Sequence, residues 1–387
     1  KYDFVIVGAG IAGCSIAHFL HKKDKNLKIL LVDRNSDVAV GASGTAGGFL
    51  SPLLGKPNKF KDLVSTALKF SIDFYKELAG EFIINKGVLR IPKNEEDKEK
   101  FFSYMQFSDF EYELKEEGAF FKIGSRVSSY DICKVLSKNC DKRFNYEVKH
   151  INFFDDIWSI NDEIQAEKLI LTTGADISLI GEKYFNIRAV WGQRIDVETS
   201  TCIPFNYHKE CSVSQSESIS NKEGKYLVSI GATHHRFNCD KDICNYCLKI
   251  PNMNNCTDFG YTKEVNNRDT KELLKMAADI TDLKDVKVVN TKIGARASSA
   301  DYFPMVGQLI NSSKTVNKFP YIMHGTNVQK SRYERYENLF VINGVGGRGF
   351  VLSPYLANKL SDFILRNREL EDDITVDRLF TKWVRSK

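Results

Sequence analysis

The chain of 387 residues has no internal repeat, no low-complexity linker and no strong excess of charge of either sign. The first absence excludes a repeat array. A balance of 55 basic against 50 acidic residues, a net charge of +5, is compatible with a polyanionic partner without demanding one. Nine cysteines, an odd number, argue against a secreted disulfide scaffold and favour a reducing, cytoplasmic location. At 42% hydrophobic composition, the chain can bury one large core or two lobes.

Long apolar runs are also missing, except for one near the start. Between Phe4 and Leu20 the only ionisable side chains near neutrality are those of Cys14 and His18, and this run is near the lower limit for a membrane span. A secretory signal would need basic residues before the run and a small-residue cleavage site after it. No other segment is apolar enough to cross a bilayer, so we expect no membrane anchor. The chain begins with Lys1 rather than Met, which is compatible with a piece of a longer polypeptide.

Three spaced glycines account for the apolar run. Gly8, Gly10 and Gly13 form G-x-G-x-x-G between "DFVIV", typical of a buried parallel strand, and the helix-compatible "IAGCSIAHFLHKK". A second strand, "KILLVDR", contains Asp33, and together these features form the dinucleotide-binding fingerprint in its required context. Gly8 permits the tight turn, Gly10 the approach of a pyrophosphate, and Gly13 close packing of helix on strand. The helix N-terminus favours phosphate, and Asp33 is expected to accept hydrogen bonds from ribose hydroxyls.

The remaining chain alternates strand and helix patterns towards both ends and is β-rich in the middle. Apolar spacing predicts helices over 61–79 and 266–280, and "FNYEVKHINFF" and "EKLILTTGAD" predict strands. We therefore predict an α/β fold in which a Rossmann-type domain is interrupted by a β-rich α+β substrate domain. The predicted nucleotide domain comprises residues 1–53, 125–187 and 288–387, and the substrate domain comprises 54–124 and 188–287. The substrate is expected at their junction.

Five motifs occur in the order found in the D-amino-acid-oxidase-like flavoproteins, which include glycine and sarcosine oxidases. They are "VIVGAGIAG", "GASGTAGGFLSPL", "LILTTGAD", "GARASSADYFPMVG" and "GVGGRGFVLSP". The chain resembles this family over nearly its whole length. Within the family, it is similar to the C-terminal, FAD-dependent half of bifunctional proteins that make 5-methylaminomethyl-2-thiouridine at the tRNA wobble position. Four short features together indicate that branch: "GASG" running into "PLL", "VWGQ", "IGATHHR" and the terminal "WVRSK".

The resemblance implies a division of labour between two halves. The oxidoreductase half oxidises the carboxymethylaminomethyl arm of a wobble uridine to aminomethyl, and hydrolysis of the imine releases glyoxylate. A separate N-terminal half then methylates the amine from S-adenosylmethionine. This chain has a single dinucleotide fingerprint and no second glycine-rich strand–helix motif. We therefore expect it to bind modified tRNA and FAD, and to oxidise without methylating.

The fingerprint and the resemblance together imply a set of FAD-binding residues. Backbone N–H groups of Gly41–Gly48 would wrap the pyrophosphate and the flavin ring, with Ser43 donating to a phosphate, and the helix after "GVGGRGF" would stabilise the reduced flavin. FAD is expected to be non-covalent, because Ala297, Ser298 and Ser299 stand where covalent sarcosine-oxidase relatives carry a cysteine. The predicted set is Gly8, Gly10, Ile11, Ala12, Gly13, Asp33, Arg34, Ala42, Ser43, Gly44, Gly47, Val148, Thr173, Gly174, Gly346, Gly347, Arg348, Gly349 and Phe350.

Two arginines are the predicted catalytic residues. Arg296 matches the arginine that binds the substrate carboxylate in glycine-oxidising relatives, and its planar fork suits a carboxylate. Arg348 is a second candidate for the same role. The sequence contains no Ser-His-Asp or paired-carboxylate pattern, and flavin amine oxidation needs mainly an unprotonated amine. His234 and His235 are interpreted as structural.

Other interpretations stay open. Lys56, Lys59 and Lys61, and Lys382, Arg385 and Lys387 around Trp383, are candidates for contacts with tRNA, although surface charge is the simpler interpretation of each. Cys239, Cys244, Cys247 and Cys256 could hold zinc or be free thiols, and we assign no metal site. Two alternative functions remain: a free amino-acid oxidase of glycine or sarcosine type, and a non-catalytic flavoprotein that binds tRNA.

Overall fold

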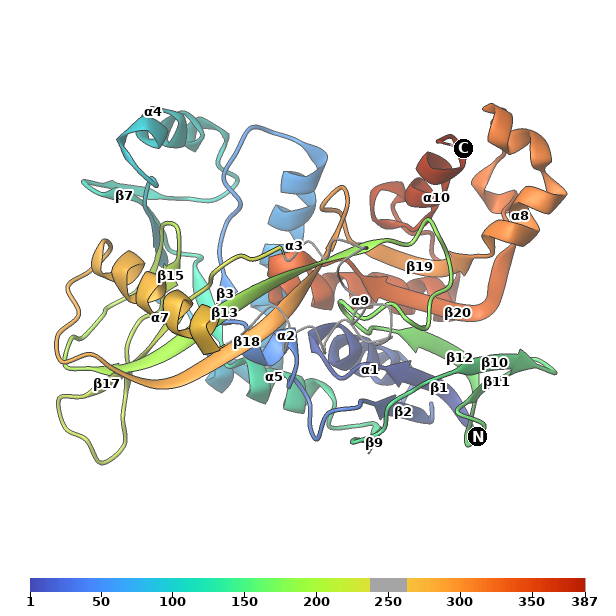
Figure 1. Cartoon of the computed structure of the whole chain (residues 1–387), viewed down its shortest axis with the longest axis horizontal. Helices are drawn as coiled ribbons and strands as arrows, with labels where there is room; N and C mark the ends of the chain where they lie inside the picture. Colours follow the sequence, from blue (N-terminus) through green and yellow to red (C-terminus); the bar gives the residue numbers. More distant parts are fainter. Residues whose placement is uncertain (237–262, 387) are drawn as a thin grey trace.

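The computed structural model describes residues 1–236 and 263–386. Two large sheets divide the molecule (Figure 1). The first sheet, which contains β1, β12 and β20, lies on the right of the view beside the helices α1 and α9. The second sheet, which contains β7, β15 and β17, lies on the left. The long strands β13 (Ile187–Thr199) and β18 (Lys287–Ser299) run side by side from the second sheet towards the first. Within the described residues, no helix has the length and apolar character that crossing a bilayer requires.

The first sheet has a parallel centre in the order β20, β12, β1, β2, β9. The antiparallel strand β19 extends it beyond β20, and the hairpin β10–β11 pairs with the beginning of β12. The bounds of these strands are β1 Tyr2–Val7, β2 Ile29–Val32, β9 Asp141–Arg143, β10 Ile151–Phe154, β11 Ile157–Ile160, β12 Ile164–Leu171, β19 Met305–Ile310 and β20 Arg335–Asn343.

Strand β1 is buried on both faces, as expected for the middle of a parallel sheet. Phe4 and Ile6 pack with one core cluster, and Val5 and Val7 pack with another on the opposite face. Helices form the first cluster, and the β10–β11 hairpin and α10 contribute to the second. The bounds of these helices are α1 Ile11–Lys23, α3 Lys59–Ala79, α5 Ser129–Leu136, α9 Gly349–Arg366 and α10 Asp377–Val384.

The second sheet follows the order β18, β13, β17, β15, β14, β5, β7, β6, with β16 paired to β17. A small sheet, β3–β8–β4, is also present. The bounds of the strands are β3 Phe49–Leu50, β4 Ile83–Ile84, β5 Val88–Arg90, β6 Glu113–Lys115, β7 Gly118–Phe121, β8 Ser125–Val127, β14 Asn206–His208, β15 Ser212–Val213, β16 Glu217–Ser218 and β17 Tyr226–Gly231. The remaining helices are α2 Ala42–Thr45, α4 Glu95–Ser103, α7 Lys263–Ala278 and α8 Ser312–Lys318.

The predicted elements agree with the structure where the apolar residues repeat with a regular period over a long segment. The helix predicted over 61–79 is α3, the one predicted over 266–280 is α7, and the final strand–turn–helix is β20 and α9. In "FNYEVKHINFF" only Ile151–Phe154 is a strand, because the preceding residues follow an irregular path after β9. Residues 41–48, whose backbone N–H groups are expected to wrap the pyrophosphate and the flavin ring, contain the short helix α2.

The strand pairing bears on the predicted domain boundary at 288. Strand β18 pairs with β13 along its length, from Ile187 opposite Ser299 to Glu198 opposite Lys287. Residues 288–299 therefore belong to the second sheet, although the sequence division placed them with the nucleotide domain. The motif around Arg296 thus lines the cavity from a strand whose backbone is paired in the second sheet. The division into two discontinuous domains otherwise remains a proposal.

A buried ion pair joins the first and last long helices. Lys23 Nζ lies 3.0 Å from Asp362 Oδ1 and donates to Asn358 O and Ser361 Oγ, each at 2.7 Å. We expect Lys23→Met to lower the free energy of unfolding by about 2 kcal/mol, because it leaves a buried carboxylate that retains only its partly exposed arginine partners. Chemical denaturation measures this change.

Lys22→Met is the matched control. Lys22 is exposed and lies 3.9 Å from an exposed glutamate, so its loss should change the free energy of unfolding by less than about 0.5 kcal/mol. Equal effects of the two substitutions would show that the Lys23–Asp362 pair does not hold α1 on α9.

Candidate active site

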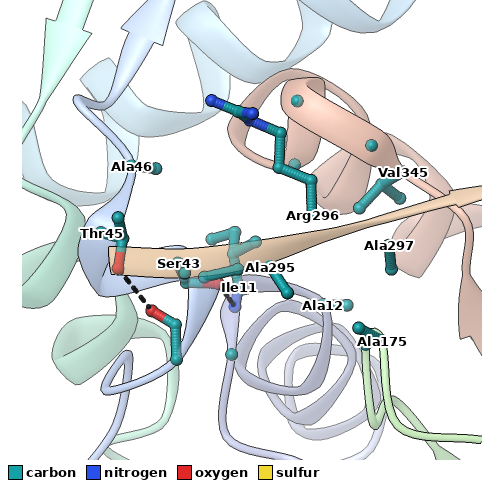
Figure 2. A pocket seen from close by; sticks show the side chains of 18 of the residues that line it. Ile11, Ala12, Ser43, Thr45, Ala46, Ala175, Ala295, Arg296, Ala297 and Val345 are labelled. Atoms are coloured by element: carbon teal, nitrogen blue, oxygen red, sulfur yellow. Dashed lines mark hydrogen bonds between the residues drawn. The ribbon is translucent and has the colours of Figure 1, made fainter. Parts of the chain in front are cut away.

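A cavity of about 910 Å³ lies where the two large sheets meet. Its walls come from the turn after β1, the α2 segment, the end of β12, the strands β13 and β18, and the turn before α9. Figure 2 shows β18 crossing this space, with Arg296 extending away from Ala295 and Ala297, as alternation along a strand requires. The cavity therefore lies at the carboxyl ends of the parallel strands, where the sequence placed it.

The glycine turn is shaped by close backbone contacts. Gly8 has φ +109°, and a Cβ atom there would lie 2.5 Å from Thr172 O. A Cβ atom on Gly13 would lie 1.8 Å from Gly8 O. The Thr172 hydroxyl donates to Gly8 O at 2.8 Å, which ties the turn to the end of β12. Side chains are excluded from this crossing, so α1 begins with its N-terminus directed at the cavity.

Asp33 and Ser43 hold this turn from two sides. Asp33 Oδ2 accepts from Ala9 N at 2.7 Å, and its Oδ1 accepts from the backbone and side chain of Asn35, each at 2.8 Å. Ser43 Oγ accepts from Ile11 N at 2.9 Å and so occupies one donor of the helix N-terminus (Figure 2). Both side chains line the cavity, but each also has a structural role that the sequence did not reveal.

Arg34 lines the cavity with its guanidinium engaged. Its Nη1 lies 3.0 Å from Asp176 Oδ2 and 4.0 Å from Glu147 Oε1. The acids at this end of the cavity are therefore tied to Arg34 and to the glycine turn. Three carboxylates, those of Asp33, Glu147 and Asp176, stand against this one guanidinium, so this end can accept hydrogen bonds from the ribose hydroxyls of a nucleotide.

Three basic side chains that the sequence analysis missed donate hydrogen bonds to the α2 segment, residues 41–48. Lys292 Nζ donates to Gly44 O at 3.4 Å, Arg194 Nη1 to Ala46 O at 2.5 Å, and Arg126 Nε to Gly47 O at 3.0 Å. The sequence did hold a signal for these cations, because a basic residue interrupts the strand patterns, as in "VWGQR" and "TKIGAR". The N–H groups of Gly44, Thr45 and Ala46 bond within the α2 turn, so donors for a ligand remain only at the ends of this segment.

Arg296 lies against backbone on the substrate side. Its Nη1 donates to Thr233 O at 3.2 Å, and a Cβ on Gly192 would lie 2.8 Å from its Nη2. Thr233 Oγ1 donates in turn to the buried Asp269 at 2.9 Å. Burial, reinforced by the charge of Arg296, lowers the pKa of His234 to about 4, so this imidazole is neutral at neutral pH.

Arg348 lines the same cavity together with Arg90, which the sequence analysis missed. Arg348 Nη1 donates to Ser51 O at 3.2 Å, and Arg90 Nη1 donates to Pro52 O at 2.8 Å. Burial and the charge of Arg348 lower the pKa of Arg90 to about 9, and burial lowers that of Arg348 to about 10. Both stay cationic at neutral pH. An arginine inside the apolar pattern "GVLRIP" was the only signal for Arg90.

Most predicted site residues line this one cavity, and two do not. Gly13 and Gly44 lie behind its wall, where they permit close packing: a Cβ on Gly44 would lie 1.7 Å from Ala39 O. The predicted residues that line it are Gly8, Gly10, Ile11, Ala12, Asp33, Arg34, Ala42, Ser43, Gly47, Val148, Thr173, Gly174, Arg296, Gly346, Gly347, Arg348, Gly349 and Phe350.

The candidate tRNA contacts separate into exposed and buried residues. Lys61 is 3% exposed and pairs with Asp109 at 2.9 Å, so its interpretation as a surface contact is wrong. The reason is that it lies on the inner face of α3. Lys59 is exposed and pairs with Asp373 at 3.0 Å. Lys56, Lys382 and Arg385 are exposed, and Trp383 packs on Phe380 with ring centroids 6.0 Å apart.

Two other predictions fall partly or wholly outside the described residues. Lys387 lies there, as do Cys239, Cys244, Cys247 and Cys256. In residues 1–236 and 263–386, no group of three or more histidine, cysteine or acidic side chains is arranged to hold a metal ion.

These features fit FAD. The N-terminus of α1 faces the cavity, and Gly10 presents no side chain there. Asp33 lines the wall after β2, and no atom lies within 4 Å of the position that a Cβ on Gly174 would take. The fold and the site thus define a dinucleotide-binding oxidoreductase whose second sheet closes the substrate side. The family model described as FAD dependent oxidoreductase (DAO) matches residues 3–363, and the chain belongs to this family.

Comparison with known proteins narrows the resemblance. The chain is 27% identical to the tRNA 5-methylaminomethyl-2-thiouridine biosynthesis bifunctional protein MnmC of Legionella pneumophila (strain Lens), over 95% of this chain and 54% of that protein. It is 23% identical to the MnmC of Campylobacter fetus, over 94% and 56%. The chain thus spans about half the length of these curated relatives, and the resemblance to the tRNA-modifying branch is confirmed.

Solved structures support the fold. Glycine oxidase from Bacillus cereus superposes with a TM-score of 0.70 at 18% identity, covering 95% of this chain and 96% of that one. L-proline dehydrogenase from P. horikoshii gives 0.64 at 13% identity, covering 98% and 97%. The predicted Rossmann-type, D-amino-acid-oxidase-like fold class is therefore confirmed.

The close contact between Gly13 and Gly8 O predicts that a side chain at position 13 weakens FAD binding. We expect Gly13→Ala to lower bound FAD at least about tenfold and to destabilise the fold by about 1–3 kcal/mol, because the new methyl group must push Gly8 O out of the turn. FAD content per chain and the thermal midpoint measure the two effects. Gly181→Ala is the control, because no atom lies within 4 Å of its Cβ position. Normal FAD content in Gly13→Ala would refute the role of this contact.

Proposed function

We propose that this chain oxidises the carboxymethylaminomethyl group on a tRNA wobble uridine to aminomethyl and releases glyoxylate. The observation that carries the proposal is a cavity that joins a dinucleotide turn to partly buried arginines on the side proposed for the substrate. The tRNA substrate enters the proposal because the two MnmC relatives are named as tRNA 5-methylaminomethyl-2-thiouridine biosynthesis proteins. Non-covalent FAD and the site residues named above are parts of the same proposal, with Arg296 as the carboxylate anchor and Arg348 as the second candidate for that role.

The reaction removes two electrons from the arm. Bound FAD would supply the two-electron acceptor for a hydride equivalent from the arm's CH₂. The C–H bond breaks and a C=N bond forms, and water then adds to this imine and breaks the C–N bond, which yields the amine and glyoxylate. Arg296 would hold the arm's carboxylate through paired, charge-assisted hydrogen bonds.

The charges around the cavity favour the reactive form of the amine. Arg296, Arg90 and Arg348 are cationic, and burial keeps His234 neutral. A positive environment disfavours an ammonium group, so it lowers the pKa of the bound amine towards the unprotonated form. No strong general base is then required, in agreement with the absence of a catalytic triad pattern from the sequence.

Partners and location follow as further proposals. The substrate is tRNA with a modified wobble uridine, in the cytoplasm, and exposed Lys56, Lys382 and Arg385 would contact its phosphates. Methylation would require a separate methyltransferase half like the one expected from the resemblance. A free amino-acid oxidase remains the second candidate, because a carboxylate-binding arginine beside the cofactor would serve glycine or sarcosine equally well.

Anaerobic mixing tests the reaction. The FAD-loaded protein should bleach when mixed with tRNA bearing 5-carboxymethylaminomethyluridine, and should yield aminomethyluridine and glyoxylate. Adding S-adenosylmethionine should give no methylated nucleoside. Bleaching by glycine or sarcosine but not by this tRNA would establish the free amino-acid oxidase instead. No bleaching by any of them would leave a non-catalytic flavoprotein.

Arg296→Ala tests the carboxylate anchor. Loss of a charge-assisted contact in a desolvated site costs about 2–4 kcal/mol, which is roughly a 30- to 900-fold fall in kcat/KM. FAD content and tRNA affinity should hardly change, and Arg296→Lys should recover only part of the loss. Arg188→Ala, an exposed position on the paired strand, is the control. Normal turnover by Arg296→Ala would move the anchor to Arg348, where alanine must then show the defect.

A further inference from the structure

Two partly buried arginines from distant parts of the chain reach one short segment. Arg90 ends β5, and Arg348 immediately precedes α9. They donate to Pro52 O and Ser51 O, the carbonyls of consecutive residues. The two guanidinium groups therefore flank the same stretch of backbone, and both line the cavity.

In residues 1–236 and 263–386 no acid pairs with either of these two arginines. Among the described residues, neither guanidinium has a carboxylate oxygen within 4.0 Å, and Arg90 Nε is buried without a hydrogen-bond partner. His208 faces the same charges, and burial with those charges lowers its pKa well below the ordinary value. Its Nδ1 contacts Ser212 Oγ at 2.7 Å, so it is a neutral neighbour and not a counter-charge.

The acidic side chains that line the cavity are either bonded to other groups or exposed to solvent. Asp33 bonds to the glycine turn, and Asp176 and Glu147 pair with Arg34. Glu210 is exposed to solvent. Two like charges held in a partly buried site, with only backbone carbonyls as partners, cost free energy, and an anion that accepts from both would recover part of it.

The number of charges exceeds what one carboxylate needs. A glycine-type arm presents a single carboxylate, and Arg296, fixed at Thr233 O, is the proposed anchor for it. Arg90 and Arg348 add two more guanidinium groups whose planar forks match carboxylate or phosphate oxygens. The additional cations favour a substrate that carries a further oxyanion.

We propose that Arg90 and Arg348 form a second anion subsite of the cavity, which binds an oxyanion of the substrate other than the carboxylate held at Arg296. The inference rests on the proposed function, because it takes the Arg296 side of the cavity as the substrate side. Its chemistry is that of a carboxylate or a phosphate, and the subsite makes Arg90 a determinant of substrate specificity.

Calorimetric titration of the FAD-loaded protein tests the subsite without turnover. The probes are glycolate, which has one carboxylate, malonate, which has two, and uridine monophosphate. We expect Arg90→Gln to weaken malonate or uridine monophosphate binding about 10- to 100-fold, and glycolate binding less than about threefold. The probe that loses affinity identifies the oxyanion as carboxylate or phosphate.

A control variant and the further outcomes below decide the proposal. Arg188→Gln, at an exposed position, must leave every probe unchanged. Equal binding of all probes by Arg90→Gln and the unchanged protein would overturn the subsite, and so would a loss of FAD content, which would assign the arginines to the cofactor. If Arg90→Gln does not fold, Arg348→Gln must give the same selective loss. Probe dependence on Arg90 without oxidation of modified tRNA would refute the proposed function and leave the subsite standing.

Discussion

The close approach of backbone at the turn after β1 is the constraint on which the rest of the site depends. Gly13 lies so near Gly8 O that no Cβ fits between them, and Thr172 fixes the same carbonyl from β12. This crossing sets where α1 begins and therefore where its unpaired N–H groups point. Asp33 and Ser43 then connect β2 and α2 to that fixed point. The nucleotide end of the cavity is thus built from backbone and short polar side chains.

Charge is handled differently at the two ends of the cavity. Near α2, Arg126, Arg194 and Lys292 donate to the carbonyls of Gly47, Ala46 and Gly44. Arg126 also pairs with Glu217, and Arg194 pairs with Asp196 at 3.2 Å, so two of these three cations have an acid partner while they fix the segment predicted to border the flavin. Arg90 and Arg348 also donate to carbonyls but have no acid within ion-pair distance in the described residues. The first group is therefore structural, and the second keeps its charge available for a ligand.

The sequence predicted features that depend on local pattern. The fingerprint Gly8–Gly13, the long helices α3, α7 and α9, and the strands β1 and β12 follow from spacing and periodicity within one segment. Arg90 could not be found in this way, because its role arises from a meeting with Arg348 across more than half the chain. The prediction for Lys61 is wrong for the opposite reason. Its local pattern is that of a surface lysine, and only the packing of α3 shows that it is buried and pairs with Asp109.

Strand β18 explains why the domain boundary is hard to draw from sequence. Its backbone pairs with β13 in the second sheet, yet a Cβ on Gly294 would lie 2.8 Å from Thr45 Oγ1 in the α2 segment. Ala297 packs into the core of the first sheet, whereas Arg296, between these two positions, points to Thr233. Gly294 and Arg296 are two residues apart and share one face of β18, whereas Ala297 lies on the other face, so this one strand meets α2, Thr233 and the core of the first sheet. A boundary placed at the start of β18 assigns the whole strand to one side, although its backbone and its side chains contact both.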